Sequence, residues 1–315
     1  NFSFVERTSL DLEALKSGIL EALDGRRFSS FRIDAKRGDK GFPLTSPEIN
    51  REIGAAVKET TGARVDLKNA ECTISIEILP HDAFFGFDKI AGPGGLPVGA
   101  SGRAVSLISG GIDSPVAAYR MMQRGCRLIF VHFHSAPYLD KSSQEKVREL
   151  VKLLTRHQFA SRLYLVPFGE IQRQIVAAVM RPLRVVLYRR MMMRIAEAIA
   201  KKEKASALVT GESLAQVASQ TLENLAVIEK AATLSILRPL VGMDKQEIID
   251  QARRIGTFET SCIPDQDCCQ LFVPRHPATK ARLADVEEAE SRLDLAGLTQ
   301  LGVERAEREE FSFPS

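Results

Sequence analysis

The sequence contains no tryptophan, and only 6% of its 315 residues are aromatic. This scarcity argues against a surface built mainly of aromatic platforms for stacking nucleic-acid bases. No apolar run approaches the roughly 20 residues that a membrane-spanning helix needs, and no basic stretch followed by an apolar one indicates a signal peptide. We therefore expect a cytoplasmic protein with no membrane partner. The chain begins with Asn1 rather than Met, which leaves open whether a segment precedes it.

The sequence also has few cysteines and only a small net charge. Of the five cysteines, Cys72 and Cys126 lie in apolar segments, which argues against a secreted disulfide framework. The other three, Cys262, Cys268 and Cys269, gather in one short stretch. A net charge of +3 and a pI of about 8.6 permit an anionic partner such as RNA without requiring one.

The length favours two domains. Residues 1–90 combine a helical apolar period at 10–23, alternating strands at 31–36 and 72–78, and a helix that opens at Ser46, a pattern typical of a small α/β module. The segment 91–102 is rich in glycine and proline and is predicted to be a linker.

From residue 103 onward, short apolar runs alternate with helical periods. This alternation predicts a doubly wound parallel sheet over 103–281, with its ligand site beyond the carboxyl ends of the strands. The acidic segment 282–315 is predicted to be a helical tail on the outside. Strands are expected at 104–108, 128–132, 163–166 and 207–210, and helices at 115–123, 143–154, 171–179, 186–202 and 245–255.

The strongest motif is the SGGIDS hexapeptide at 109–114, between a strand and a helix that begins near Pro115. The two glycines let successive N–H groups point into one concavity, and the helix N-terminus adds positive charge, so the motif favours phosphate binding. Hydroxyls of Ser109 and Ser114 are further donors, while Asp113 is expected to hold Mg²⁺ or to orient the loop. The motif matches neither the Walker loop nor GxGxxG, and the alternative is a plain strand-to-helix turn.

This hexapeptide resembles the PP-loop ATP pyrophosphatases, which cleave ATP to AMP and pyrophosphate while adenylating an oxygen. Further segments narrow the resemblance to the 4-thiouridine tRNA synthetase family, ThiI. These are FPLTSPEIN in the first module, VHFHS from Val131, GESLAQVASQT from Gly211, ILRPL from Ile236, MDKQEI from Met243 and DCCQLF from Asp267. The resemblance implies an RNA-binding THUMP domain at 1–90, with the family's preceding ferredoxin-like domain largely absent. It also implies an adenine nucleotide alpha hydrolase-like PP-loop domain at 103–281.

The resemblance implies a reaction. The C4 oxygen of a tRNA uridine, expected at the eighth position, attacks the α-phosphate of ATP. Sulfur delivered as a cysteine persulfide then replaces AMP and gives 4-thiouridine. The implied partners are tRNA, a cysteine desulfurase as sulfur donor and a second copy of the chain. The cofactors are ATP and Mg²⁺, and some relatives also serve thiamine biosynthesis.

The resemblance also implies site residues. Asp113 and Lys245 match positions required for activity, and Cys269 matches the family's essential cysteine. Many relatives carry a second thiol on a rhodanese-like domain that is not in this sequence, so Cys262 and Cys268 are the candidates for it. His132 is placed near the base or ribose, or has a structural role. The expected ATP-binding residues are Ser109, Gly110, Gly111, Asp113, Ser114, His132, Phe133, Gly211, Glu212 and Gln220.

Three alternatives stay open. An iron–sulfur cluster on Cys262, Cys268 and Cys269 competes with the persulfide route, although adjacent cysteines ligate one cluster awkwardly. An AMP-forming ligase or amidotransferase would leave DCCQLF and the first module without a purpose, and the other candidate is a non-catalytic tRNA-binding protein.

Six basic residues are candidates for contacts with RNA phosphates, and the alternative is that they form a solvated surface with salt bridges. They are Arg32, Lys36, Arg37, Lys40, Arg190 and Arg194.

Overall fold

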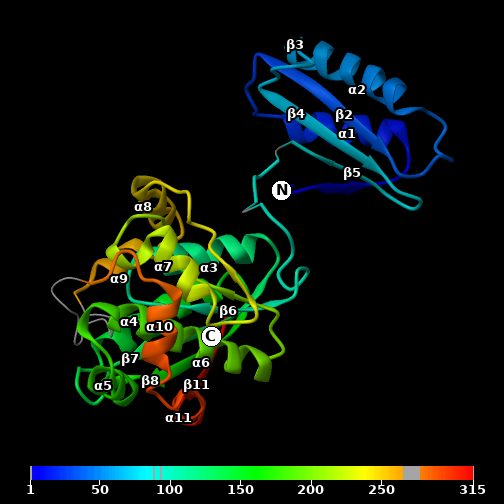
Figure 1. Cartoon of the computed structure of the whole chain (residues 1–315). Coiled ribbons are helices and arrows are strands. Elements are labelled where there is room, and N and C mark those ends of the chain that lie inside the picture. The colour runs from blue at the N-terminus through cyan, green and yellow to red at the C-terminus, as the bar shows by residue number, and fades with distance from the viewer. Residues whose placement is uncertain (1, 88, 93, 265–276, 315) are drawn as a thin grey trace. The chain divides into compact units, whose positions relative to one another are not determined.

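The computed structural model describes residues 2–87, 89–92, 94–264 and 277–314. The chain divides into two compact units, Asn1–Gly94 and Gly95–Ser315, each with its own hydrophobic core (Figure 1). The two units are described separately below.

The smaller unit is a five-stranded sheet with two helices. Strand β2 pairs in parallel with β3 and β4, and β5 pairs antiparallel with β4 and β1, which gives the order β1-β5-β4-β2-β3. Its elements are β1 (Glu6–Thr8), α1 (Leu12–Leu23), β2 (Ser30–Arg37), α2 (Ser46–Thr61), β3 (Arg64–Val65), β4 (Cys72–Ile78) and β5 (Ala83–Gly86).

Local sequence explains where the two helices begin and which face they bury. The Asp11 side chain accepts the Ala14 N–H at 2.9 Å and so caps α1, while Thr45 and Glu48 form a capping box at the start of α2. The apolar positions of both helices pack on one face of the sheet with Phe31 and Ile33. Arg32 and its neighbours at every second position lie on the other face, as the pleat of a strand requires.

The larger unit is a six-stranded sheet covered by helices on both faces. Its strands are β6 (Arg103–Leu107), β7 (Arg127–His134), β8 (Ala160–Pro167), β9 (Ala207–Val209), β10 (Ser235–Leu237) and β11 (Glu307–Ser312). Its α-helices are α3 (Asp113–Gln123), α4 (Ser142–Thr155), α5 (Gly169–Ala178), α6 (Arg184–Lys202), α7 (Leu222–Glu229), α8 (Lys245–Arg254), α9 (Phe258–Cys262), α10 (Leu283–Glu290) and α11 (Leu295–Glu304).

The strand order β10-β9-β6-β7-β8-β11 creates a switch point. From β6 the chain moves through β7 to β8 in one direction, and β9 then returns to the opposite side of β6, with every pair from β10 to β8 parallel. One core packs against α3, α4 and α8, and the other packs against α5, α6, α10 and α11. The doubly wound sheet is therefore confirmed, and its crevice is expected between the carboxyl ends of β6 and β9.

The end of the chain differs from the expected helical tail. Helices α10 and α11 form, but the chain then adds β11, which pairs antiparallel with β8 from Glu307↔Leu165 to Ser312↔Ala160. Arg148 on α4 donates to both carboxylate oxygens of Glu309 at 2.8 to 3.0 Å, and Phe311 packs against the core. The strand signal is hard to see because β11 is a charged edge strand with only one large apolar side chain.

Candidate active site

A cavity of about 330 Å³ opens at the switch point, within the size range of small-molecule sites. It is lined by the ends of β6, β7 and β9, by the start of α3, by one face of α6 and by residues 217–220. The lining residues are Leu107, Ile108, Ser109, Asp113, Ser114, His132, Phe133, Val185, Arg189, Met192, Met193, Thr210, Gly211, Val217, Ser219 and Gln220. Most of the ATP-binding residues expected from the sequence therefore meet around one cavity.

The loop between β6 and α3 is closed by its two serines. The Ser114 hydroxyl accepts the Ser109 N–H at 2.9 Å and donates to the Ser109 carbonyl oxygen at 3.2 Å, while Ser109 Oγ accepts the Gly111 N–H at 3.3 Å. Within the described residues, the N–H groups of Gly110 and Ile112 have no acceptor. Together with the first turn of α3, these free donors suit phosphate oxygens.

The glycines near the loop differ in how tightly their surroundings pack. Neither Gly110 nor Gly111 has a positive φ, so the turn does not need a left-handed backbone. A Cβ on Gly111 would make an ordinary contact, 3.5 Å from Ser109 Oγ. A Cβ on Gly211 would lie 2.7 Å from both the Cα and the N of Ser114, so the segment after β9 packs directly on the start of α3.

Asp113, which lines the cavity, forms an ion pair with Lys245, 132 positions later in the sequence. Lys245 Nζ lies 2.6 Å from Asp113 Oδ1, and Gln216 Nε2 donates to Asp113 Oδ2 at 3.0 Å. Lys245 is the first residue of α8, whose N-terminus is fixed by a capping box of Asp244 and Glu247. The sequence analysis did not select Gln216, although it lies inside the GESLAQVASQT segment.

His132 lines the cavity while its ring nitrogens contact the protein. Nδ1 donates to the Ile108 carbonyl oxygen at 3.0 Å, and Nε2 lies 3.4 Å from the Ser143 hydroxyl. Its ring stacks on His134 with 6.4 Å between centroids. Burial, followed by the charges of His132, Arg148 and Lys141, lowers the pKa of His134 to about 4, so this imidazole is neutral near pH 7.

Glu212 is not among the residues that line the cavity, and its expected contact with the nucleotide stays a prediction. Its side chain is 1% exposed and forms ion pairs with Arg189 at 2.6 Å and Arg238 at 2.7 Å. Burial opposes its ionisation, but the two guanidiniums and a hydrogen bond from Thr210 hold its pKa below the usual value. Glu212 instead fixes Arg189, a cation at the cavity that the sequence analysis did not assign to ATP.

Two family descriptions match this chain. Residues 99–295 match the family described as Thiamine biosynthesis protein (ThiI), and residues 10–88 match the THUMP domain. The first match spans more than half of the 315 residues. The chain belongs to the ThiI family.

Similar proteins support this assignment. A protein named probable tRNA sulfurtransferase from Thermus thermophilus is 55% identical over 313 residues, which are 99% of this chain and 77% of that protein. One of the same name from Moorella thermoacetica is 48% identical over 308 residues, which are 98% of this chain and 79% of that protein. A crystal structure of a 4-thiouridine synthetase–RNA complex with bound ATP matches with a TM-score of 0.89 and 36% identity, covering 99% of this chain and 83% of that one.

In this ThiI-family chain the residue before the first cysteine of the cysteine-rich stretch contacts the phosphate loop. Cys262 is exposed at the end of α9. On one side of it, Ser261 Oγ donates to the Gly111 carbonyl oxygen at 3.4 Å, and on the other, Lys146 Nζ donates to the Ile263 carbonyl oxygen at 2.5 Å. The residues flanking Cys262 are thus tied to the loop and to α4.

The roles predicted for Cys268 and Cys269 lie outside the described residues and stay predictions. In the part of the chain that the structure describes, no three His, Cys, Asp or Glu side chains form a group that could hold a metal ion. Across the same residues, none of the helices has the length and apolar character that spanning a bilayer demands.

The basic residues assigned to RNA have different environments. Arg190 is only 2% exposed and pairs with Glu290 at 2.7 Å, so its assignment to an RNA surface is wrong. Arg194 pairs with the same carboxylate at 2.7 Å and is also largely buried. These two arginines of α6 and Glu290 therefore form a largely buried ionic cluster.

The THUMP residues are more accessible. Arg37 donates to the carbonyl oxygens of Phe42 and Leu44, both at 3.1 Å, and so holds the loop that precedes α2. Arg32 Nε donates to Thr73 Oγ1 at 3.0 Å. Lys36 and Lys40 are exposed, and their assignment to RNA stays a prediction.

Proposed function

We propose that this chain uses ATP, bound in the switch-point cavity, to replace the C4 oxygen of a tRNA uridine by sulfur. The carrying observation is a cavity lined by the phosphate loop and by Asp113, with Lys245 paired to Asp113, in a ThiI-family chain. The names of the similar proteins, tRNA sulfurtransferase and 4-thiouridine synthetase with RNA and ATP, support the same reaction.

The first step activates an oxygen that cannot leave by itself. The uridine C4 oxygen forms a bond to the α-phosphorus of ATP, and the bond from that phosphorus to pyrophosphate breaks. Free N–H groups of the loop are suited to hold the departing phosphates, and the Lys245 ammonium offsets negative charge that develops on the α-phosphate. The Asp113 carboxylate is a suitable oxygen ligand for Mg²⁺, which would neutralise phosphate charge when bound.

The second step replaces AMP by sulfur. The terminal sulfur of a Cys269 persulfide attacks C4, and AMP leaves with its oxygen. A second thiolate, from Cys262 or Cys268, then attacks the Cys269 sulfur, which releases 4-thiouridine and leaves a cysteine–cysteine disulfide for reduction. The position of Cys262 beside the loop, held on both sides by Ser261 and Ile263, supports its part in this step.

The remaining assignments are also proposals. A cysteine desulfurase supplies the sulfur, two copies of the chain share one tRNA, and the protein works in the cytoplasm, with a further role in thiamine synthesis. An iron–sulfur cluster on Cys262, Cys268 and Cys269 is the alternative to the persulfide. Visible absorbance of anaerobically purified protein, present with the wild type and lost in Cys262→Ser, would favour the cluster.

A reconstitution experiment tests the reaction. The full chain is incubated with a tRNA transcript, ATP, Mg²⁺, cysteine and a cysteine desulfurase, and the digested nucleosides are analysed by mass spectrometry. We expect 4-thiouridine in an amount that depends on ATP. Its absence, with protein that binds both ATP and tRNA, would reject the proposal.

Two variants separate the proposal from its alternatives. Cys269→Ser should still release pyrophosphate in a tRNA-dependent manner but should form no 4-thiouridine, whereas an AMP-forming ligase would keep its full activity. Asp113→Ala should abolish pyrophosphate release, whereas in a non-catalytic tRNA-binding protein it would change nothing that can be measured.

A further inference from the structure

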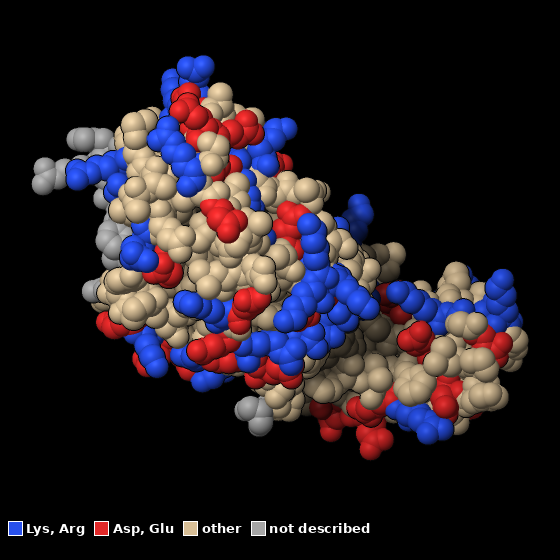
Figure 2. All heavy atoms as spheres, turned by 60° about the horizontal axis from the view of Figure 1, so that its bottom comes forward, with Lys and Arg blue, Asp and Glu red and all other residues tan. Residues whose placement is uncertain are grey.

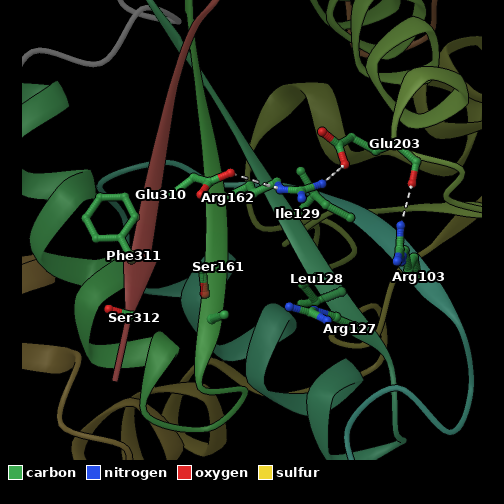
Figure 3. Close-up of a pocket in the computed structure, with 11 residues that line it drawn as sticks. Arg103, Arg127, Leu128, Ile129, Ser161, Arg162, Glu203, Glu310, Phe311 and Ser312 are labelled. Atoms are coloured by element: carbon green, nitrogen blue, oxygen red, sulfur yellow. Dashed lines mark hydrogen bonds and ion pairs between the residues drawn. The ribbon is translucent and has the colours of Figure 1, made fainter. Parts of the chain in front are cut away.

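A second cavity, of about 350 Å³, lies at the amino ends of the parallel strands in the large sheet (Figure 3). The ATP cavity lies at the other, carboxyl ends of these strands. Arg103 and Arg127 are the first residues of β6 and β7, whereas the phosphate loop follows the last residue of β6. The lining comes from the amino ends of three parallel strands, from the end of β11 and from Glu203 after α6. It comprises Arg103, Arg127, Leu128, Ile129, Ala160, Ser161, Arg162, Glu203, Glu310, Phe311 and Ser312.

Strand register places three arginines on one face of the sheet. Arg103 and Arg127 are direct partners in the parallel β6–β7 pair. Ile129, two residues after Arg127 and on the same face, is the partner of Arg162 on β8. Three arginines from three adjacent strands therefore line this cavity from one face of the sheet, and we call this arginine-lined part of the cavity the rim.

Among the residues that the structure describes, only Arg162 of these three arginines has carboxylate partners. Arg162 pairs with Glu203 at 2.6 Å and with Glu310 at 3.5 Å. The other oxygen of Glu203 accepts the Tyr164 hydroxyl at 2.5 Å, so both oxygens of this buried carboxylate accept hydrogen bonds. Figure 3 shows Arg103 reaching only the main-chain oxygen of Glu203, at 3.3 Å.

The charges of Arg103 and Arg127 are therefore uncompensated within the described residues, where neither has an ion-pair partner. Like charges directly opposite each other on neighbouring strands destabilise a sheet. On the face shown in Figure 2, Lys and Arg gather in one contiguous patch and are interspersed with Asp and Glu over the rest. An anion at the rim would remove the repulsion, and two guanidinium forks match the oxygens of a phosphate group.

We propose that this rim is a phosphate-binding site, distinct from the ATP cavity, in which Arg103 and Arg127 hold one phosphate group. The chemistry is the same whether the group belongs to the backbone of tRNA or to free inorganic phosphate. Because the two cavities lie at opposite ends of β6, a phosphate binds here while ATP fills the loop.

The test compares two double variants of the full chain with the same change in charge. Arg103→Ala/Arg127→Ala removes the rim, and Arg156→Ala/Arg254→Ala removes two exposed arginines from other helix ends. Thermal unfolding is followed with and without inorganic phosphate, at saturating ATP so that the loop is filled. Binding of a tRNA transcript is measured over a range of salt concentrations.

Either of two results would support the site, and each identifies where the bound phosphate group comes from. If the rim binds the RNA backbone, the rim variant binds tRNA about tenfold more weakly, and the slope of log K against log salt falls by about 1 to 2 units relative to the control. If it binds free phosphate, tRNA binding is unchanged, and only the phosphate-dependent rise in Tm is lost.

Equal behaviour of the rim and control variants in both assays overturns the proposal. Should the double alanine variant fold poorly, Arg103→Lys/Arg127→Lys retains the charge but loses the planar fork. That variant should lose phosphate-dependent stabilisation while its tRNA slope falls less than that of the alanine variant. Wild-type behaviour of a folded lysine variant in the phosphate assay would also count against the site.

Discussion

At the scale of single residues, the side chains of the candidate site differ in how far they are exposed to solvent. Asp113 and Lys245 meet in a partly exposed ion pair, whereas Glu212 and His134 are buried behind the cavity. Partly exposed pairs contribute little to stability, so the loss of the Asp113–Lys245 pair should hardly affect folding. Buried groups act on stability and position the residues that face the ligand.

Lys245→Met should leave the fold intact and slow adenylation. The pair with Asp113 is partly exposed, so its loss should change the free energy of unfolding by less than about 1 kcal/mol. Loss of one cation at the α-phosphate should lower the rate of pyrophosphate release about 100-fold or more. Lys230→Met, an exposed lysine at the end of α7, is the matched control, and equal rates for the two variants would contradict the assignment.

Gly211→Ala and Gly111→Ala should differ in stability although both lie at the loop. The added methyl would lie 2.7 Å from the Ser114 backbone in the first case but 3.5 Å from a hydroxyl in the second. We expect Gly211→Ala to cost about 1 to 3 kcal/mol, as overpacking usually does. Chemical unfolding measures the difference, and a Gly111→Ala variant as unstable as Gly211→Ala would contradict this packing.

The buried imidazole of His134 predicts a loss of stability in acid. Its pKa is about 4 in the folded chain against an ordinary value of 6.5, so between these values the unfolded chain binds more protons. Its contribution is complete above pH 6.5 and falls as the pH drops towards 4, by up to about 3 kcal/mol. Urea unfolding at about pH 7 and about pH 5 should show a smaller drop for His134→Gln than for the wild type or for the exposed control His81→Gln.

At the scale of elements, α4 and α9 meet where the cysteine-rich stretch begins. Lys146 on α4 is only 6% exposed and donates to the carbonyl oxygen of Ile263, one residue after Cys262. This contact fixes the start of the stretch independently of the ATP cavity, since Lys146 does not line it. We therefore expect that positioning of Cys262 and binding of the nucleotide can be separated.

Lys146→Met should impair sulfur transfer more than adenylation. Without the ammonium, the Ile263 carbonyl has lost its donor and Cys262 is held less firmly, while the loop keeps its own hydrogen bonds. We expect pyrophosphate release within about twofold of the wild type and 4-thiouridine formation lowered about tenfold or more, as misplacement of a reacting group predicts. Lys152→Met, an exposed lysine on the same helix, should change neither, and a parallel loss of both activities in Lys146→Met would exclude a positioning role.

Much of this element-level organisation was predictable from the sequence. The strand–loop–helix around Ser109 and the sheet of alternating strands follow from short apolar runs and helical periods. The partners of buried charges were not predictable. The sequence around Arg190 suggests an exposed arginine, because its partner Glu290 lies 100 positions later and only the fold places the two side chains in contact. Strand β11 was missed for a related reason, since its alternation is carried by charged side chains whose partners lie on α4 and β8.

At the scale of the whole molecule, the two units have separate cores. The core of Asn1–Gly94 contains only residues of that unit, and the two cores flanking the large sheet belong to Gly95–Ser315. The cavity at the phosphate loop is built within the second unit alone. Nucleotide binding should therefore not need the first unit.

The fragment 95–315 should fold by itself and bind ATP. Its affinity should be within about threefold of that of the full chain, because every residue that lines the cavity is retained. We expect its 4-thiouridine formation to be lost, since tRNA binding is assigned to the THUMP unit. Calorimetry with ATP and the reconstituted reaction test this, and a folded fragment with full thiolation would show that the first unit is dispensable.

Strand β11 also bears on how the larger unit is made. It follows every other element of this unit in the sequence, yet it covers the edge of β8, which is synthesised about halfway along the chain. During translation, the backbone N–H and C=O groups on that edge of β8 stay unpaired until residues 307–312 have left the ribosome. The sheet of the nascent chain is therefore open to wrong strand pairing for most of its synthesis, and closing it is a late, long-range event.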